Sequence, residues 1–271
     1  MLINGQPASS IAASDRGLQY GDGVFETIAV IDGRPCLWSW HMQRLNRGCE
    51  RLRIQCPDPE LLYREALSVS DRPGYCVLKI IVTRGAAGRG YLPNEQECSP
   101  TRILAAFDWP PGVSWSAPQS VRLCICTVRL AVNPLLAGIK HLNRLEQVLA
   151  AAECHERGYE EGLMLDTNEL VIEGTRSNVF LVRDHRLYTP DLQYCGIDGV
   201  VRELLIENVI DHELPVTVTK LTLADIQTAD EIFICNSIMG IRPVVAVDGH
   251  DTAGTAVSTA LSRRLARVMT G

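Results

Sequence analysis

The sequence predicts a mixed α/β protein with mixed sheets, built as two lobes, and three observations lead to this prediction. Strand-like apolar runs alternate with helical runs along the chain. With 271 residues, 46% of them hydrophobic, the chain can fill one large core or two modest ones. Three prolines lie within the ten residues from Trp109 to Pro118, which marks a boundary. We therefore expect a smaller N-terminal α/β domain over 1–108, a linker over 109–119 and a larger C-terminal domain over 120–271.

The N-terminal lobe starts with strands and tight turns. Asn4-Gly5 and Asp32-Gly33 are hairpin signals, and residues 25–31 between them have the composition of a strand. A helix should follow, because apolar residues recur at helical spacing: Met42, Leu45, Cys49 and Leu52. A second helix is expected over 60–69, and strands over 76–82 and 101–107.

The C-terminal lobe alternates strands and helices without an internal repeat. A strand over 121–127 precedes an expected helix that begins near Lys140 and ends at Gly158. Its apolar positions have helical spacing: Leu142, Leu145, Val148, Leu149 and Ala152. Strands are expected over 162–166, 170–173, 178–182, 216–221, 231–235 and 244–247, with further helices from Gly199 and over 255–269.

Charge and composition exclude several classes of function. The net charge is −6 at pH 7 and no run of basic residues occurs, so a general nucleic-acid surface is not expected. Met1 is followed by Leu-Ile-Asn-Gly rather than by a basic and then an apolar segment, and no stretch of about 18 apolar residues occurs. We expect a soluble cytoplasmic protein that binds neither nucleic acid nor membrane.

The ten cysteines predict reduced, structural side chains rather than a metal site. No two of them have CxxC spacing, and the six histidines form neither an HxxxH nor an HExxH pattern. Cys124 and Cys126 alternate within a strand-like run, as small buried hydrophobic side chains would.

Lysine is scarce, which narrows any chemistry that needs a primary amine. The chain has 23 arginines but only three lysines, Lys79, Lys140 and Lys220. A lysine amine can become neutral and attack a carbonyl, whereas a guanidinium stays protonated. Lys79 and Lys220 lie in strand-like runs, while Lys140 lies at an expected strand-to-helix junction, where the helix N-terminus disfavours a positive charge. Lys140 is therefore the candidate amine, and a solvated lysine in a first helical turn is the alternative.

Three further features could hold a phosphorylated ring. Glu173 ends an expected strand, where its carboxylate could pair with a ring nitrogen or belong to an ordinary turn. The N–H groups that open the helix after Gly199, and the Asn236-Ser237 pair at a strand end, could donate to phosphate or serve only as caps. Arg44 flanks the apolar stripe of the first helix, as a phosphate ligand or as a solvated surface arginine.

In combination these residues resemble the fold-type IV pyridoxal-phosphate (PLP) enzymes, a family that includes branched-chain and D-amino-acid aminotransferases and aminodeoxychorismate lyases. The resemblance rests on Glu-x-x-x-x-Asn-Val-Phe over 173–180, Tyr-Thr-Pro over 188–190 and Gly-Val-Val-Arg over 199–202, and it extends from Asn4 to Pro243. It implies the two-lobed fold-type IV architecture and pyridoxal 5'-phosphate as the cofactor. It also implies a homodimer whose larger domain carries Lys140 and most cofactor contacts.

The resemblance implies a role for each matching position. Lys140 corresponds to the lysine that forms the Schiff base, and Glu173 to the partner of the pyridine nitrogen. The matching phosphate contacts are Arg44, the backbone N–H groups of Val200 and Val201, and the Ser237 hydroxyl, with Asn236 beside it as a further candidate cofactor contact. Where the family often has a tyrosine after the lysine, this chain has Asn143-Arg144-Leu145.

The residues around Lys140, Leu-Ala-Gly-Ile-Lys-His-Leu-Asn-Arg-Leu-Glu-Gln-Val-Leu over 136–149, are most similar to those of the aminodeoxychorismate lyases. This implies a carbon–oxygen lyase of folate biosynthesis that converts 4-amino-4-deoxychorismate to 4-aminobenzoate and pyruvate, with Lys140 as acid and base. The substrate has two carboxylates, so we expect cations and ring-lining side chains from Tyr20, Arg84, Arg89, Tyr91 and Arg144. The alternatives are an aminotransferase acting on branched-chain or D-amino acids and a non-catalytic cofactor-binding protein.

Overall fold

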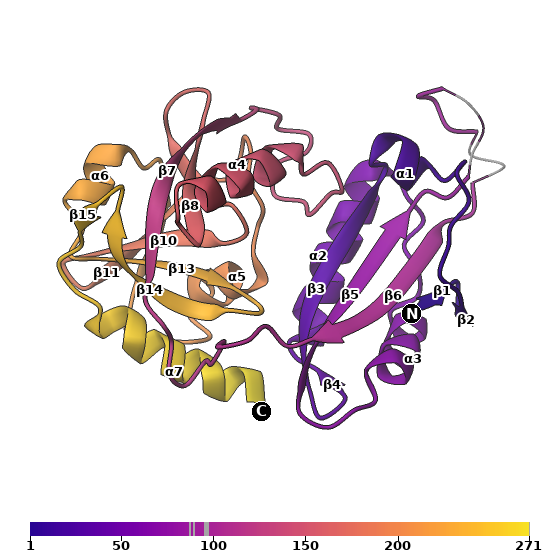
Figure 1. The fold of residues 1–271 in the computed structure, drawn as a ribbon, viewed down its shortest axis with the longest axis horizontal. Coiled ribbons are helices and arrows are strands. Elements are labelled where there is room, and N and C mark those ends of the chain that lie inside the picture. Colours follow the sequence, from indigo (N-terminus) through magenta and orange to yellow (C-terminus); the bar gives the residue numbers. More distant parts are fainter. Residues whose placement is uncertain (87, 89, 95–97, 271) are drawn as a thin grey trace. The chain divides into compact units, whose positions relative to one another are not determined.

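The computed structural model describes residues 1–86, 88, 90–94 and 98–270, which form two compact units (Figure 1). One unit contains Met1–Pro111 together with Ile139–Asn143, and the other contains Gly112–Gly138 and Arg144–Gly271. The first boundary between the units, between Pro111 and Gly112, lies inside the proline-rich segment in which the sequence predicts a linker. Each unit has its own sheet and its own buried core, and the predicted mixed α/β class is confirmed.

The first unit is a six-stranded antiparallel sheet with the strand order β2-β1-β6-β5-β3-β4. Its strands are β1 (Leu2–Ile3), β2 (Gln6–Pro7), β3 (Gly23–Ile31), β4 (Arg34–Pro35), β5 (Tyr75–Thr83) and β6 (Thr101–Asp108). Its helices are α1 (Arg16–Tyr20), α2 (Trp38–Leu52) and α3 (Pro59–Ser70). The two predicted hairpin turns connect β1 to β2 and β3 to β4, so those predictions are confirmed.

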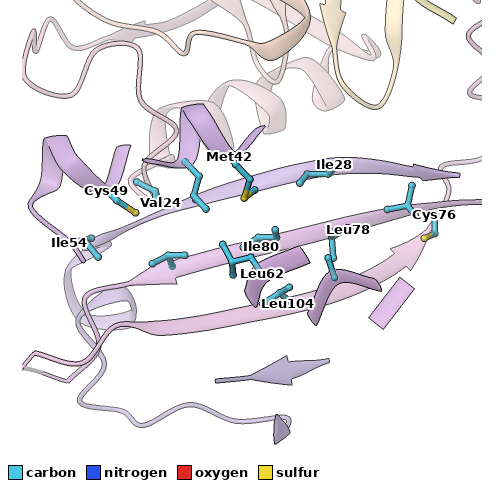
Figure 2. Close-up of a cluster of buried hydrophobic side chains, with 14 residues drawn as sticks. Val24, Ile28, Met42, Cys49, Ile54, Leu62, Cys76, Leu78, Ile80 and Leu104 are labelled. Carbon is cyan, nitrogen blue, oxygen red and sulfur yellow. The ribbon is translucent and has the colours of Figure 1, made fainter. Parts of the chain in front are cut away.

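The core of this unit lies where α2 and α3 pack on the sheet. Figure 2 shows side chains of β3, β5 and β6 turned toward the two helices, and all of those labelled are buried. The predicted apolar stripe of α2 is confirmed, because Met42, Leu45 and Cys49 are buried in this cluster and Leu52 packs against it. Fully burying one such side chain contributes about 2 kcal/mol, so this stripe holds α2 on the sheet.

The second unit contains a nine-stranded mixed sheet. Eight strands follow the order β12-β11-β10-β13-β14-β7-β8-β9, and the ninth, β15, pairs with β14. They are β7 (Val121–Leu130), β8 (Glu161–Asp166), β9 (Val171–Gly174), β10 (Asn178–Arg183), β11 (Arg186–Pro190), β12 (Val216–Thr219), β13 (Glu231–Asn236), β14 (Gly240–Val247) and β15 (His250–Asp251). Strand β7 pairs in parallel with both β14 and β8, whereas β9, β10 and β13 pair with their neighbours in antiparallel fashion.

Four helices surround this sheet: α4 (Leu145–Glu156), α5 (Val200–Ile206), α6 (Leu223–Gln227) and α7 (Ala256–Thr270). One buried cluster includes Ile226 of α6, and a second includes Ala150 and Cys154 of α4. The rings of Phe180 and Phe233 stack within the sheet, with their centroids 5.0 Å apart. No helix among the described residues is long and apolar enough to cross a membrane.

Lys140 does not lie in a helix, which corrects one expectation from the sequence. Helix α4 begins at Leu145, and residues 139–143 instead run beside β3. The N–H of Phe25 donates to the Lys140 carbonyl at 2.9 Å, and the N–H of Leu142 donates to the Gly23 carbonyl at 3.0 Å. These bonds group the Lys140 segment with the first unit, whereas the sequence predicted that the larger second domain would carry it.

Gly23 explains how this segment approaches β3 so closely. A Cβ atom at position 23 would lie 2.5 Å from the Val82 carbonyl oxygen and 2.8 Å from a methyl carbon of Leu142. Both distances are shorter than real Cβ contacts, so a larger residue would clash with the β5 backbone and displace the Leu142 side chain.

The buried face of α4 also differs from the expected one. Leu145, Val148 and Leu149 are more than half exposed, although their spacing is that of an apolar helix face. The helix instead buries Gln147, Ala150 and Cys154, of which Ala150 and Cys154 pack into a core cluster of its own unit. Here the spacing of apolar residues correctly predicts that a helix forms, but it does not predict which face of that helix is buried.

Candidate active site

The Lys140 amine lies beside an aromatic ring rather than at a helix terminus. Its Nζ is 4.3 Å from the centroid of the Phe25 ring, and Lys79 Nζ approaches the same ring at 5.3 Å. The face of an aromatic ring attracts an ammonium group. Helix α4 begins only at Leu145, so Lys140 is not in its first turn as the sequence predicted.

Arg44 belongs to a buried network in the same unit. Glu26 of β3 is fully buried, and its two carboxylate oxygens accept hydrogen bonds from Arg44 Nε at 2.8 Å and from Arg44 Nη2 at 2.5 Å. His41 Nδ1 is 2.7 Å from Glu26 Oε2. Arg44 itself is 5% exposed, so the alternative of a solvated surface arginine does not hold.

Opposing effects fix the charges in this network. Burial alone raises the pKa of Glu26, but Arg44 and His41 outweigh burial and lower that pKa to about 2. Burial lowers the pKa of His41, and the charges of Arg44 and Lys140 act in the same direction, while Glu26 opposes them. An ionised Glu26 therefore accepts a hydrogen bond from the Nδ1–H group of a neutral His41. The other ring nitrogen, His41 Nε2, is buried and has no hydrogen-bond partner among the described residues.

We expect Glu26→Gln to remove an acid-sensitive part of the stability. The pKa of Glu26 falls from its ordinary value of 4.5 to about 2 on folding, so the folded protein binds fewer protons between these pH values. The stabilisation is complete above about pH 4.5 and is lost as the pH falls through 2. Urea unfolding should therefore show that the substitution costs about 2 kcal/mol more at pH 7 than at pH 3. Glu50→Gln, an exposed carboxylate on α2, is the control, and equal losses at both pH values for Glu26→Gln would contradict the assignment.

Arg84, an expected ligand of a substrate carboxylate, is committed to other partners. Its Nε and Nη2 donate to Asp22 at 2.7 and 3.0 Å. Its Nη1 and Nη2 also donate to the carbonyls of Arg53 and Leu52 at the end of α2. These bonds join the loop before β3 to α2, which gives Arg84 a structural role; its expected contact with a substrate carboxylate stays a prediction.

Arg16, for which the sequence predicted no role, contacts both Tyr20 and Tyr91. Arg16 is 2% exposed, donates to Asp22 at 2.9 Å and to the carbonyls of Gly90 and Tyr91, and lies 4.7 Å from the centroid of the Tyr20 ring. The rings of Tyr20 and Tyr91 meet edge to face, with centroids 5.6 Å apart. The structure thus brings together two of the expected substrate-lining residues. Arg89 lies outside the described residues.

In the second unit, Glu173 is buried on β9 with both carboxylate oxygens bound. The N–H of Ile197 donates to Oε2 at 2.8 Å, and Gln147 Nε2 donates to Oε1 at 3.2 Å. Burial lowers the pKa of Arg144, while the charges of Glu173 and Glu146 raise it, so Arg144 is close enough to Glu173 to interact electrostatically. Glu173 is therefore a fixed, buried carboxylate rather than an ordinary turn residue. The sequence analysis did not identify Gln147.

The motif that follows Glu173 holds the loop before α5. Asn178 Nδ2 donates to the Ile197 carbonyl at 2.8 Å, so Glu173 and Asn178 bind the two backbone polar groups of one residue. Arg202 of α5 also binds this loop. Its Nη1 donates to Asp198 at 2.5 Å, and its Nη2 donates to the Pro190 carbonyl at 2.8 Å. The spacing of Glu173, Asn178 and Arg202 thus fixes the position at which α5 begins.

The expected phosphate donors of the second unit lie in different local surroundings. Val200 and Val201 are buried at the start of α5, and Gly199 precedes them in extended conformation. Ser237 is buried just after β13. The Asn236 side chain is used within its own turn: Oδ1 accepts from Ile238 and Met239, and Nδ2 donates to the Arg176 carbonyl. Asn236 therefore shapes the turn through its side chain, and its expected phosphate contact stays a prediction.

Comparison with known proteins identifies the family. Residues 23–247 match the amino-transferase class IV family, which is well over half of the chain. The chain belongs to the class IV aminotransferase family. As the sequence resemblance predicts, members of this family are PLP-dependent enzymes, and the fold class is confirmed by a solved relative. That relative is a 4-amino-4-deoxychorismate lyase from Pseudomonas aeruginosa, with 46% identity, a TM-score of 0.90 and coverage of 98% of both chains.

Two curated class IV relatives show the range of activities near this sequence. An aminodeoxychorismate lyase from Vibrio harveyi is 35% identical over 263 residues, 97% of each chain. A putative branched-chain-amino-acid aminotransferase from Methanocaldococcus jannaschii is 33% identical over 248 residues, which cover 89% of this chain and 84% of the relative.

Proposed function

We propose that this class IV enzyme is a lyase that converts 4-amino-4-deoxychorismate to 4-aminobenzoate and pyruvate, a step of folate biosynthesis. The observation that carries the proposal is full-length similarity to two proteins that bear the name of this activity. They match 97–98% of the chain, with 35% and 46% identity. The aminotransferase from Methanocaldococcus jannaschii supports the second candidate, transamination, over a smaller share of both chains.

In this proposal, the donors that pyridoxal phosphate needs are the residues that correspond to the family pattern. Lys140 supplies a primary amine, Glu173 a buried carboxylate for the ring nitrogen, and Ser237 and the N–H groups of Val200 and Val201 donors for the phosphate. We keep Arg44 as a further phosphate ligand, because Glu26 holds its guanidinium in place through Nε and Nη2. Bound in this way, the cofactor would supply an electron sink.

In this proposal Lys140 has two tasks. Its amine would hold the cofactor covalently. As acid and base, the amine would also remove the proton from C4 of the substrate and later return a proton to the leaving enolpyruvyl group. Such proton transfers need a base whose pKa lies near the working pH. The product becomes aromatic as the enolpyruvyl group leaves, so no second keto acid is required.

Glu173 would keep a proton on the ring nitrogen of the cofactor. A carboxylate does this through its charge, and the hydrogen bonds from Ile197 and Gln147 fix the direction of its oxygens. The substrate carboxylates need cations, for which we propose Arg144 and Arg89, with Tyr20 and Tyr91 beside the substrate ring. Arg16 holds these two tyrosines in place through its bond to the Tyr91 carbonyl and its contact with Tyr20.

We further propose a cytoplasmic homodimer. Support for the dimer comes from α4, where Leu145, Val148, Leu149 and Ala152 form an exposed apolar stripe at helical spacing. An exposed apolar stripe of this kind is typical of an association surface. Support for the compartment comes from the cysteines, since all ten are free thiols in the part of the chain that the structure describes.

We expect Leu149→Glu to convert a dimer to a monomer, because it places a charge in the centre of the apolar stripe of α4. Sedimentation velocity should give half the wild-type mass at micromolar concentration. Ala151→Glu, an exposed position of the same helix outside the stripe, is the matched control and should remain dimeric. A dimeric Leu149→Glu protein would show that α4 is not the association surface.

Two assays separate the lyase from the aminotransferase. The purified holoenzyme should release 4-aminobenzoate from 4-amino-4-deoxychorismate, and this release should not depend on an added keto acid. The same preparation should transfer amino groups from branched-chain or D-amino acids to a keto acid much more slowly. Fast transamination without 4-aminobenzoate would favour the second candidate.

A further inference from the structure

Three cysteine thiols of the second unit converge in its core. Cys124 and Cys126 lie two residues apart on β7 and therefore point to the same face of the strand. Cys154 of α4 packs over that face, with its Sγ 2.9 Å from Cys124 Sγ and 3.7 Å from Cys126 Sγ. All three sulfur atoms lie within 4.8 Å of one another. Two sulfurs that bind one ion at about 2.3 Å are separated by at most about 4.6 Å, so one ion can bridge the close pairs.

Gly162 of β8 gives the three sulfurs their space. A Cβ atom at position 162 would lie 2.4 Å from Cys126 Sγ, 2.4 Å from Cys154 Sγ and 3.4 Å from Cys124 Sγ. The three sulfurs thus face one point beside the Gly162 backbone, which any side chain at that position would obstruct.

The surroundings of the three thiols are apolar. Cys124, Cys126 and Cys154 are at most 2% exposed, and their neighbours in this core include Leu130, Ala150, Met164 and Ile172. Burial raises the pKa of Cys124 to about 12, and burial also raises the pKa of Cys126. Among the described residues, no other group of three or more His, Cys, Asp or Glu side chains is close enough to hold an ion.

We propose that these three thiols form a binding site for a trivalent thiophilic ion, of which arsenic(III) is the type. The reaction is a ligand exchange without oxidation: arsenous acid, As(OH)3, and three thiols give As(SR)3 and three water molecules. Three As–S bonds form, three As–O bonds break, and each thiol proton leaves with a hydroxide. The product has no net charge, which suits a site that is enclosed by apolar side chains.

The same argument disfavours zinc. Zinc bound by three thiolates would leave a net negative charge in the core, and this is costly although Arg157 acts favourably on Cys124. Structural zinc also takes four ligands, and the cluster offers three. Since the site is covered by α4, loading requires α4 to open locally and should be slow.

The test uses the reduced holoenzyme under anaerobic conditions, without added thiols, and arsenite as the probe. After gel filtration we expect one arsenic atom per chain, with three sulfur neighbours by X-ray absorption spectroscopy. Cys154→Ala should retain at least tenfold less arsenic. Cys195→Ala, which removes another buried cysteine of the same core, should bind like the wild type. Zinc alone, applied in the same way, should not be retained.

Several results would overturn the proposal: no retained arsenic, two sulfur neighbours instead of three, undiminished retention by Cys154→Ala, or retention of zinc at these sulfurs. If Cys154→Ala fails to fold, the wild-type protein alone can test the site by alkylation. Loaded and unloaded protein are unfolded and alkylated at once, and mass spectrometry should show Cys124, Cys126 and Cys154 protected by arsenic. Protection of other cysteines in their place would refute the site.

Discussion

Lys140→Ala should lower the rate of 4-aminobenzoate formation by at least about 1,000-fold, within the range that positioned acid–base groups contribute. In the proposed mechanism, the variant lacks the amine that would hold the cofactor and the base that would take the C4 proton. Its purified form should lack the absorbance band of the lysine-linked cofactor. Steady-state kinetics and the absorption spectrum measure the two losses separately.

The matched control is Lys79→Ala, because Lys79 Nζ approaches the same Phe25 ring from β5. It should keep the cofactor band and most of the activity. Only three lysines occur in the chain, so Lys220→Ala completes the set. An active Lys140→Ala enzyme, or an inactive Lys79→Ala enzyme with an intact Lys140, would contradict the assignment of the amine.

Glu173→Gln should reduce the turnover rate by about 100-fold, comparable to removing one preorganised electrostatic group from an active site. An amide of the same shape keeps the packing but cannot hold a proton on the ring nitrogen through its charge. The substitution should leave the protein folded, because the N–H of Ile197 can still donate to the amide oxygen. The rate constant of the chemical step and the amount of bound cofactor are the measurements.

Gln147→Leu distinguishes the charge of Glu173 from its position. Gln147 donates to Glu173 Oε1, so its loss should disturb the orientation of the carboxylate but not its charge, and the rate should fall less than in Glu173→Gln. A Glu173→Gln enzyme with a rate within threefold of the wild type would remove Glu173 from the mechanism.

Local patterns predicted much of the fold correctly. The stripe of Met42, Leu45 and Cys49 identified α2 and its buried face, and two dipeptide turns identified the hairpins of the first sheet. These features depend on residues close in sequence, so spacing and turn chemistry suffice to predict them. The same reasoning failed for Lys140, because its backbone is bound to β3, more than a hundred residues earlier.

Most of what the sequence missed depends on long-range pairing. Nothing in the sequence indicated that Arg84 pairs with Asp22, which lies 62 residues away in sequence. A sequence signal did exist for Glu26, since it alternates with Val24 and Ile28 on the buried face of β3. The three thiols lack a metal-site spacing because Cys154 reaches Cys124 and Cys126 from a different element.

The assignment as a lyase is tested most directly by product analysis. Purified enzyme loaded with pyridoxal phosphate is incubated with 4-amino-4-deoxychorismate in the absence of any keto acid, and both products are quantified over time. We predict equimolar 4-aminobenzoate and pyruvate over many turnovers, with no conversion by Lys140→Ala. Absence of 4-aminobenzoate, or turnover that begins only when a keto acid is added, would contradict the proposed function.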